Sequence, residues 1–354
     1  MRKTYKYRIY PTKAQAETLD RWLWLCRKLY NACLEQRQIA WSQRRQVSKF
    51  DQMKELPGLK VGLPKYKEIG SQVLQDVIDR LDKSFQKFFA GGGYPKFQGR
   101  YRYNSITYKQ AGWKLANDRL VLAKCGALKV RWSREIEGDI KTVTIKRSKV
   151  GEWYVCFSCD NVPAPMYPST TAEVGIDLGI AALAITSDGE KFENARYLKG
   201  KLRQLRRLQR HMARQKNKRS NRRRKTVRQI QRLHEKVANQ RRDAQHKAST
   251  SLVRRYAKIA HEDISPQFMI HNRRLSRAAA DVGWSQFLTF LQSKAAAAGR
   301  LVVAVNPAHT SQMCSGCGVI VPKKLSDRWH DCPDCGTSLD RDHNAAINIL
   351  RRAA

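Results

Sequence analysis

The sequence is poor in acidic residues and contains no long apolar run. Only 30 Asp and Glu stand against 69 Lys and Arg, which leaves a formal net charge of +39. A chain with so much uncompensated charge repels itself unless a polyanion neutralises it, and nucleic acid is the natural candidate. No stretch approaches the roughly 18 apolar residues that a membrane-spanning helix needs, so we expect no membrane partner.

The nine cysteines are odd in number, which disfavours the disulfide framework of a secreted protein. We therefore expect a reducing compartment. The opening residues MRKTYKYRIYP lack the apolar core of a secretory signal, which favours a cytoplasmic protein. A length of 354 residues is enough for two or three domains with separate cores.

The N-terminal half mixes strand-like and helical patterns. Residues 1–10 alternate apolar and basic side chains and predict a strand. Residues 11–92 predict two helices, the second over 71–90, joined by a loop over 47–70 that is rich in Gly and Pro. Residues 93–168 predict short strands of a barrel or curled sheet. We expect the first strand to pair into that sheet, with the helices as an insertion.

The C-terminal half predicts an α/β domain over residues 169–309, interrupted by a helical hairpin over 201–255. The hairpin is strongly basic, because residues 201–228 hold 14 Lys or Arg and no acid. A cysteine module follows over 310–338, and a last helix closes the chain over 339–354. Strands that alternate with helices are typical of a mainly parallel sheet.

The most specific motif is a pair of C-x2-C turns. Cys314 and Cys317 are followed, after fourteen residues, by Cys332 and Cys335. Four thiolates suit tetrahedral Zn²⁺ and leave no open position, so the spacing predicts a structural zinc site. His330 is near in sequence, but the four cysteines already complete the shell.

A further C-x2-C pair, Cys156 and Cys159, lies in a predicted strand. Residues three apart in a strand face opposite sides, so this pair would chelate a metal poorly. We expect core cysteines here. Cys26 and Cys33 fall on the apolar face of a predicted helix and are also expected in the core.

Asp177 lies in the apolar segment VGIDLGI. A charged side chain inside an apolar strand is costly unless it is paired or binds a metal. The neighbouring Gly175 and Gly179 would leave room for a ligand. Asp177 is therefore a candidate metal ligand.

Further acids stand at the end of a later strand and at the start of the final helix. Strand alternation allows Glu262 or Asp263, but not both, to face the same site. In the last helix, Asp342 shares the face that must pack on the sheet, whereas Asp340 lies off it and suits a capping role. Three converging carboxylates can hold two Mg²⁺ ions for phosphodiester hydrolysis, and Mn²⁺ can substitute.

Two long stretches carry a family resemblance. YKYRIYPTKAQAETLDRWLWLCRKLYNACL near the start, and WSQFLTFLQSKAAAAGRLVVAVNPAHTSQMCSGCG with the later DRDHNAAINI, resemble TnpB proteins. These are RNA-guided DNA endonucleases encoded by bacterial transposons and related to type V CRISPR effectors. The resemblance covers nearly the whole chain.

The resemblance implies an α/β plus β-barrel fold. A RuvC-type, RNase H-like nuclease domain would carry a zinc-ribbon insertion, and a wedge-like barrel would carry an inserted helical recognition lobe. The parts would be the first barrel strand at 1–10, the recognition lobe at 11–92, the rest of the barrel at 93–168, the nuclease domain at 169–309 and 339–354, and the zinc ribbon at 310–338.

The family's three catalytic, Mg²⁺-binding acids carry over onto Asp177, Glu262 and Asp342, which selects Glu262 over Asp263. The implied partners are a guide RNA and target double-stranded DNA. A transposase of the same element is a further partner that the resemblance allows, and it implies a monomer on one RNA. A bacterial, cytoplasmic protein that joins the nucleoid when bound to DNA is expected.

Gln72 and Gln75 lie on the polar face of the predicted helix 71–90. Because glutamine can bind adenine through two hydrogen bonds, they are candidates for binding a short motif beside the target. A merely solvated face explains them equally well. The basic residues of 201–228 would hold nucleic acid through its backbone, while base pairing with the guide selects the sequence.

Two alternatives share some of these features. A DDE-type transposase that performs strand transfer would also use three acids on an RNase H-like fold. A DNA-binding repressor would need no nuclease site, and the intact Asp177 argues against it. The resemblance over the whole chain favours the endonuclease.

Overall fold

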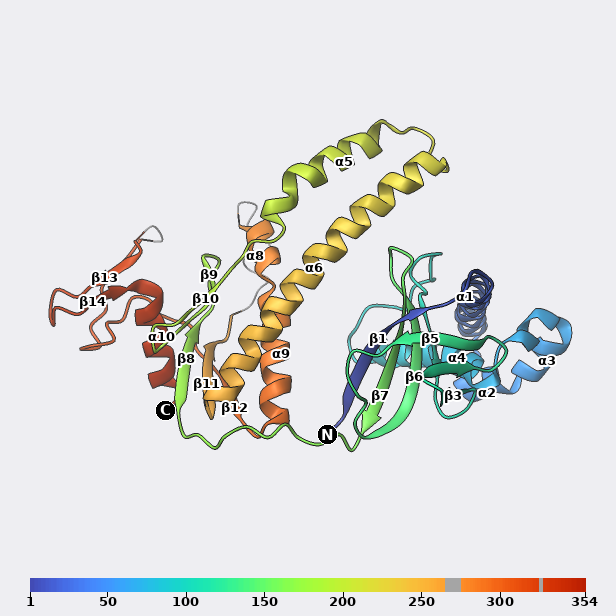
Figure 1. Cartoon of the computed structure of the whole chain (residues 1–354), viewed down its shortest axis with the longest axis horizontal. Helices are drawn as coiled ribbons and strands as arrows, with labels where there is room; N and C mark the ends of the chain where they lie inside the picture. Colours follow the sequence, from blue (N-terminus) through green and yellow to red (C-terminus); the bar gives the residue numbers. More distant parts are fainter. Residues whose placement is uncertain (265–274, 325–326) are drawn as a thin grey trace. The chain divides into compact units, whose positions relative to one another are not determined.

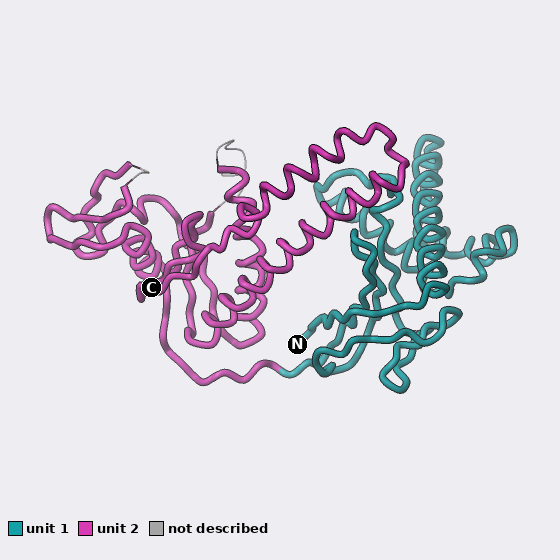
Figure 2. The backbone as a smooth tube through the Cα atoms, turned by 45° about the horizontal axis from the view of Figure 1, so that its top comes forward, with its two compact units in different colours: residues 1–163 teal, residues 164–354 magenta. Residues whose placement is uncertain are grey.

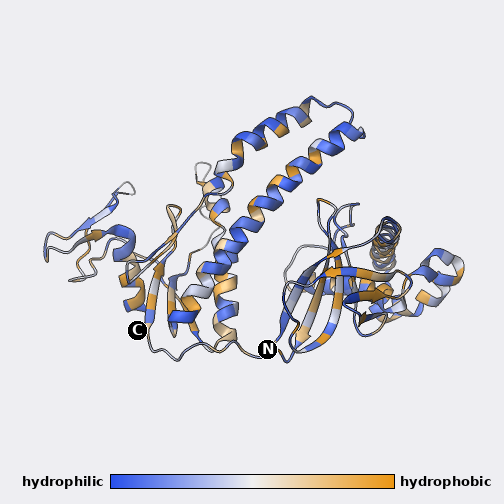
Figure 3. Ribbon diagram, viewed as in Figure 1, coloured by the Kyte–Doolittle hydropathy of each residue, from blue (hydrophilic) through white to orange (hydrophobic). Residues whose placement is uncertain are grey.

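The computed structural model describes residues 1–264, 275–324 and 327–354. The chain divides into two compact units, residues 1–163 and residues 164–354 (Figure 1, Figure 2). Each unit has its own apolar core, and Figure 3 shows hydrophobic residues along its strands and on its helices. The finer subdivision expected from the sequence stays a prediction.

The first unit is built on a curled, antiparallel seven-stranded sheet that forms a nearly closed barrel. β1 lies between β7 and β5, so the N-terminal strand pairs into the sheet as predicted. Its alternation has the expected result, because Tyr5, Tyr7 and Ile9 are buried while Lys6 on the other face is exposed. The strands are β1 (Lys3–Tyr10), β2 (Ser105–Tyr108), β3 (Trp113–Ala116), β4 (Arg119–Leu122), β5 (Gly126–Arg131), β6 (Asp139–Arg147) and β7 (Trp153–Asp160).

Two long helices of this unit, α1 (Lys13–Ser42) and α4 (Ser71–Phe89), follow the predicted pattern. The loop expected over 47–70 is wrong, because two short helices and a 3-10 turn form there. Pro57 lies in the first helical turn, where its missing N–H costs nothing. The additional elements are α2 (Lys49–Lys54), α3 (Leu56–Gly62) and η1 (Pro64–Glu68).

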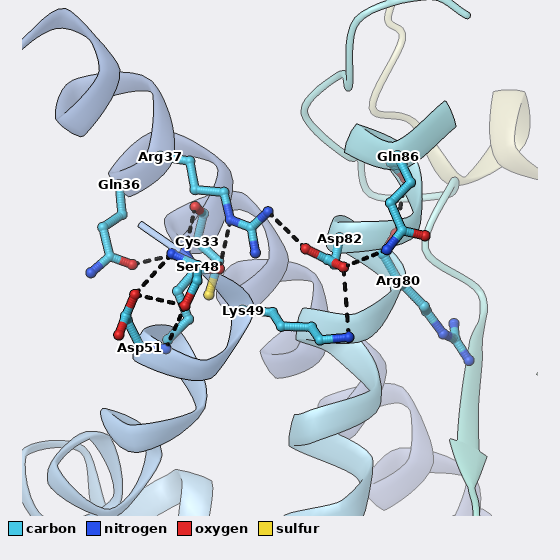
Figure 4. A network of polar contacts seen from close by, with 11 residues as sticks. Cys33, Gln36, Arg37, Ser48, Lys49, Asp51, Arg80, Asp82 and Gln86 are labelled. Atoms are coloured by element: carbon cyan, nitrogen blue, oxygen red, sulfur yellow. Dashed lines mark hydrogen bonds and ion pairs between the residues drawn. The ribbon is translucent and has the colours of Figure 1, made fainter. Parts of the chain in front are cut away.

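A partly buried polar network joins α1, α2 and α4 (Figure 4). Arg37 donates to Gln52 at 3.0 Å and pairs with Asp82 at 3.2 Å. Gln52 in turn donates to the backbone oxygen of Cys33 and to the side chain of Gln36, both at 2.8 Å. Because each buried group needs its partner in place, the network fixes the three helices relative to one another.

The second unit contains a five-stranded sheet in the order β10-β9-β8-β11-β12. β8, β11 and β12 run parallel, and β9 and β10 are antiparallel additions at one edge. Parallel neighbours need long crossover connections, and helices supply them here. The strands are β8 (Glu173–Asp177), β9 (Ala182–Thr186), β10 (Lys191–Glu193), β11 (Lys258–Glu262) and β12 (Leu301–Val305).

Helices cover both faces of this sheet (Figure 1). On one face, Leu252 of α6 and Phe287 of α9 join Ile176 of β8 in the main apolar cluster. On the other face, Ile349 of α10 packs with Ala260 of β11. The remaining elements of the unit are η2 (Lys199–Lys201), α5 (Leu202–Arg214), α6 (Asn221–Arg255), α8 (Ser276–Val282), α9 (Trp284–Ala297), β13 (Trp329–Asp331), β14 (Ser338–Asp340) and α10 (Arg341–Arg352).

The basic helical hairpin forms from α5 and α6, and Figure 3 shows that it is mainly hydrophilic. Within residues 201–228, twelve of the 14 Lys and Arg side chains are exposed, so few of them support packing. Leu205 and Leu233 are buried. Among the described residues, no helix is long and apolar enough to cross a membrane.

Gly175 allows α10 to lie directly against β8. A methyl group on Gly175 would be 2.1 Å from the backbone oxygen of Ala346 and 2.7 Å from the backbone nitrogen of Leu350. The expectation that this glycine leaves room for a ligand is therefore wrong. Helix backbone fills the space instead.

Gly175→Ala should destabilise the second unit by about 1–3 kcal/mol, because the added carbon overpacks a rigid contact between helix and strand. Urea unfolding followed by circular dichroism measures the loss. Gly200→Ala is the control, since its added carbon meets nothing within 4 Å. Equal stability of the two variants would show that α10 does not approach β8 this closely.

Candidate functional site

Three acidic residues meet at one edge of the second unit's sheet. Asp177 ends β8 and Glu262 ends β11, and these parallel strands pair with Ile176 opposite His261. One residue further along, Asp177 and Glu262 are therefore neighbours on the same face of the sheet. Asp342 lies in the first turn of α10, which packs on that face.

The contact between Gly175 and α10 sets the position of Asp342. Gly175 precedes Asp177 by two residues, so both face α10. Ala346 follows Asp342 by one helical turn, so both lie on the same side of the helix. The contact of Gly175 with the Ala346 backbone therefore brings Asp342 close to Asp177.

The carboxylates interact electrostatically. The side chain of Asp177 keeps some exposed surface, but protein atoms surround its carboxylate. This burial, together with the negative charges of Glu262 and Asp342, raises the pKa of Asp177 well above its usual range, and Arg341 opposes the shift only in part. A cation at this edge would remove the repulsion.

Glu262 is the buried acid of the pair at the end of β11, with 9% of its surface exposed, whereas Asp263 is exposed. The hydroxyl of Thr310 donates to Oε1 of Glu262. Burial raises the pKa of Glu262, and the hydrogen bond from Thr310 acts in the opposite direction. Of the two alternatives left by strand alternation, Glu262 is the one that faces the interior.

Asp342 is held by its neighbours in the first turn of α10. Nε and Nη2 of Arg341 donate to Oδ1 of Asp342 at 3.0 and 2.9 Å. Asp340 caps the helix by accepting from the backbone nitrogens of Asp342 and His343, as expected. The His343 ring lies 3.0 Å from the backbone oxygen of Ser187, in the turn after β9.

The three carboxylates supply the hard oxygen donors that suit Mg²⁺. Among the described residues, the four cysteines are the only group whose ligand atoms all lie within 4.8 Å of one another. The carboxylates are spaced more widely, which is compatible with two ions about 3.5–4 Å apart. The donor types therefore suit Mg²⁺, and in the ion-free structure their ligand atoms are spaced more widely than those of one compact cluster.

The four cysteines of the zinc module converge as their spacing predicts. Cys314 and Cys335 have sulfurs 3.6 Å apart, and those of Cys317 and Cys332 are 3.5 Å apart. A tetrahedral ion with Zn–S bonds of about 2.3 Å would separate its sulfurs by about 3.8 Å, so the cluster fits Zn²⁺. A side chain at Gly316 would meet Thr337 at 2.3 Å, so the first turn needs glycine there.

The surroundings of Cys314 favour its thiolate. Burial opposes ionisation, but N–H groups of Cys317 and Gly316, with the ring of His330, lower the pKa of Cys314 to about 5. The Gly316 nitrogen lies 3.2 Å from the sulfur. His330 is fully buried, and its Nδ1 contacts the amine of Lys323.

Of the four cysteines predicted to lie in the core, Cys26, Cys33 and Cys159 do so, whereas Cys156 does not. Cys159 is fully buried, and Cys156 is half-buried on the opposite face of β7. Cys26 and Cys33 are buried on α1, and burial raises the pKa of each to about 12. Such thiols are poor nucleophiles and poor metal ligands.

The two glutamines of α4 differ in their environment. The side-chain oxygen of Gln72 accepts from the backbone nitrogens of Gln110 and Ala111 at 3.0 and 2.9 Å. Bidentate binding of adenine would need that oxygen, so these two bonds would have to break first. Gln75 is exposed, and its role as a reader of bases stays a prediction.

Sequence analysis missed Thr310, Asn344 and Asn348. Thr310 is 3% exposed and the two asparagines are fully buried. A partial signal existed, because two amides spaced by one helical turn in an otherwise apolar helix face are costly unless hydrogen-bonded. Their partners could not be named from the sequence.

Comparisons with known proteins place three family models along the chain. A model described as a probable transposase matches residues 156–273, and one described as a Cas12f1-like TNB domain matches residues 284–349. A model described as a helix-turn-helix domain matches residues 1–46, which here form the strand β1 followed by the single long helix α1.

Two curated relatives align over most of their own length. The chain is 36% identical to a putative RNA-guided DNA endonuclease of Streptomyces pristinaespiralis, over 99% of this chain and 89% of that protein. It is 32% identical to the putative RNA-guided DNA endonuclease InsQ of Escherichia coli (strain K12), over 80% of this chain and 75% of that protein. Both alignments span the two compact units.

A solved structure has a similar fold. The structure of the mini-RNA-guided endonuclease CRISPR-Cas_phi3 matches with a TM-score of 0.50 and 12% identity, over 100% of this chain and 92% of that one. Fold and sequence together therefore define the class of compact proteins with a RuvC-type domain and a zinc ribbon. Within that class, the chain belongs to the TnpB family.

Cys332→Ser should reduce the zinc content from about one ion per chain to near zero, because three thiolates no longer complete the tetrahedral shell. Metal analysis of the purified protein measures the change. The matched control is Cys156→Ser, which alters a cysteine outside the cluster and should leave zinc unchanged. Full zinc occupancy in Cys332→Ser would contradict the four-cysteine site.

In the metal-free protein, Asp177→Asn should raise the melting temperature at neutral pH. Folding raises the pKa of Asp177 above 3.8, so the folded state holds this proton more tightly than the unfolded state does. Stability is therefore lost as the pH rises above about 4, and asparagine avoids the loss because it releases no proton. Thermal melts in EDTA from about pH 4 to about pH 8 measure the effect.

The melting temperature of Asp177→Asn should exceed that of the wild type by more as the pH rises. Added Mn²⁺ should stabilise the wild type more than the variant. Asp263→Asn, at the exposed acid beside Glu262, is the control and should melt like the wild type. A constant difference between variant and wild type at every pH would show that Asp177 is not ionising against its neighbours.

Proposed function

We propose that this protein is an RNA-guided DNA endonuclease that cuts both strands of a target with one carboxylate site. The observation that carries the proposal is the convergence of Asp177, Glu262 and Asp342 at one sheet edge, where mutual repulsion favours a bound cation. Two relatives aligned over most of their length are named putative RNA-guided DNA endonucleases, which supports the same activity.

Mg²⁺ is the proposed cofactor, and Asp177, Glu262 and Asp342 would hold it. When bound, a pair of Mg²⁺ ions supplies an activated water and stabilises charge at the scissile phosphate. The residues of the chain do the positioning. Glu262 accepts a hydrogen bond from Thr310, and Asp342 accepts one from Arg341. Zn²⁺ at the four cysteines would be structural, since the thiolates fill its shell.

The exposed basic residues of α5 and α6 are the proposed contact for nucleic acid. With twelve exposed Lys and Arg within residues 201–228, this hairpin can neutralise a phosphate backbone without reading its bases. A guide RNA paired with target DNA presents such a backbone, and base pairing supplies the sequence specificity. Gln75 on α4 is the proposed reader of a short motif beside the target.

Strand transfer by a DDE-type transposase is the main rival, and one family model is described as a probable transposase. The two relatives named as endonucleases align over most of their length, whereas that model matches only residues 156–273. A repressor without nuclease activity would not need three acids kept in mutual repulsion. Both observations favour the endonuclease.

RNA that co-purifies with the protein tests the proposal. We expect a discrete RNA, and we expect the complex to cut DNA that matches it when Mg²⁺ is present. Asp177→Ala should abolish cutting while RNA and target binding remain, because the change removes a metal ligand and leaves the basic hairpin intact. Sequencing of the bound RNA and a gel-based cleavage assay provide the measurements.

RNA-free protein that joins transposon ends would overturn the proposal in favour of strand transfer. Full-rate cutting by Asp177→Ala would show that the carboxylate site is assigned wrongly. Asp263→Ala is the matched control, since it removes an exposed acid from the same strand end and should cut normally.

A further inference from the structure

A series of buried hydrogen bonds links Glu262 to the first cysteine turn. Thr310 lies between the end of β12 and Cys314, and its hydroxyl donates to Oε1 of Glu262. The same hydroxyl is 3.1 Å from the backbone oxygen of Pro307, but the charged carboxylate is the stronger acceptor. A hydrogen bond to one oxygen limits rotation of the carboxylate and leaves the other oxygen free for a cation.

Asn348 of α10 holds Thr310 in place. Its Nδ2 donates to the backbone oxygen of Thr310 at 2.9 Å and to that of Met313 at 2.6 Å. One turn earlier, Asn344 donates to the same Met313 oxygen at 2.8 Å and accepts from the Ser315 nitrogen at 2.8 Å. The segment that carries Thr310 is thus bound to α10 on both sides of Cys314.

The same helix carries Asp342 in its first turn. Because a helix is rigid over three turns, a segment fixed at Asn344 and Asn348 has a fixed distance from Asp342. Because Thr310 in this segment donates to Glu262, the position of Glu262 relative to Asp342 depends on the same segment. The spacing between the carboxylates of Glu262 and Asp342 therefore depends on Thr310 and Asn348, neither of which is a proposed metal ligand.

The buried Oδ1 of Asn348 has no hydrogen-bond partner among the described residues, so this side chain bonds only through Nδ2, to the backbone oxygens of Thr310 and Met313. Burying an amide with an unused acceptor costs stability. The two bonds from Nδ2 hold the segment that carries Thr310, which is how outer-shell partners of metal ligands generally act.

We propose that Thr310 and Asn348 are positioning residues of the carboxylate site, with Thr310 orienting Glu262 and Asn348 fixing Thr310 on the helix that carries Asp342. The inference rests on the proposed metal-dependent cleavage. It adds that the segment leading into the zinc module is part of the support of the nuclease site.

The test uses the full chain with its bound RNA and Mn²⁺ alone as the probe. Thr310→Val removes the hydroxyl at nearly constant shape and should weaken Mn²⁺ binding, followed by electron paramagnetic resonance, by about 10–100-fold. The cleavage rate should fall and recover at saturating Mn²⁺, which a general folding defect would not produce. Thr310→Ser keeps the hydroxyl and should restore both values.

Thr186→Val is the matched control, because it removes another buried hydroxyl, which among the described residues bonds to backbone groups of Glu190 alone. Asn348→Leu should weaken Mn²⁺ binding in the same direction as Thr310→Val. Zinc content should stay at the wild-type level in Thr310→Val and in Thr186→Val. Loss of the zinc module is then not the cause of any change in Mn²⁺ binding.

Wild-type Mn²⁺ affinity in Thr310→Val, with affinity lost in Asp177→Ala, would overturn the inference and leave the proposed function standing. Wild-type affinity in Asn348→Leu would overturn the role of Asn348. If Asp177→Ala binds Mn²⁺ as tightly as the wild type, the proposed function itself fails, and the inference fails with it.

Discussion

The close contact between α10 and β8 is the constraint on which the second unit depends. Gly175 lets the backbone of Ala346 approach the strand. A single carbon added to Gly175 would lie 2.1 Å from the backbone oxygen of Ala346. Interiors are packed too densely to absorb such an overlap without a shift. Because Asp342 lies in the first turn of this helix and Asp177 ends this strand, the contact that builds the core also brings two acids together.

That arrangement places negative charges where each raises the energy of the others. Asp177 has a raised pKa because it is buried beside Glu262 and Asp342, in a chain whose net charge is +39. The basic residues lie mainly on exposed surfaces such as the hairpin, where water screens them from the acids. The protein thus separates an acidic edge suited to cations from a basic surface suited to polyanions.

How far the sequence could predict this structure depends on the distance over which each signal acts. The long helices α1 and α4 and the alternating strand β1 were predictable, because each carries its pattern through several turns or residues. The helices within 47–70 were missed, since six or seven residues are too few to show a period. The four cysteines were predictable because their local spacing already encodes the site.

The support of the carboxylates could not be predicted, because it depends on contacts between distant segments. Thr310 and Glu262 are 48 residues apart, and nothing in either neighbourhood indicates the other.

The central claim is that Asp177, Glu262 and Asp342 hold divalent ions. Anomalous X-ray scattering from crystals of the RNA-bound protein grown with Mn²⁺ tests it most directly. The account predicts manganese peaks within bonding distance of all three carboxylates, and their absence beside a clear zinc peak at the four cysteines would contradict it.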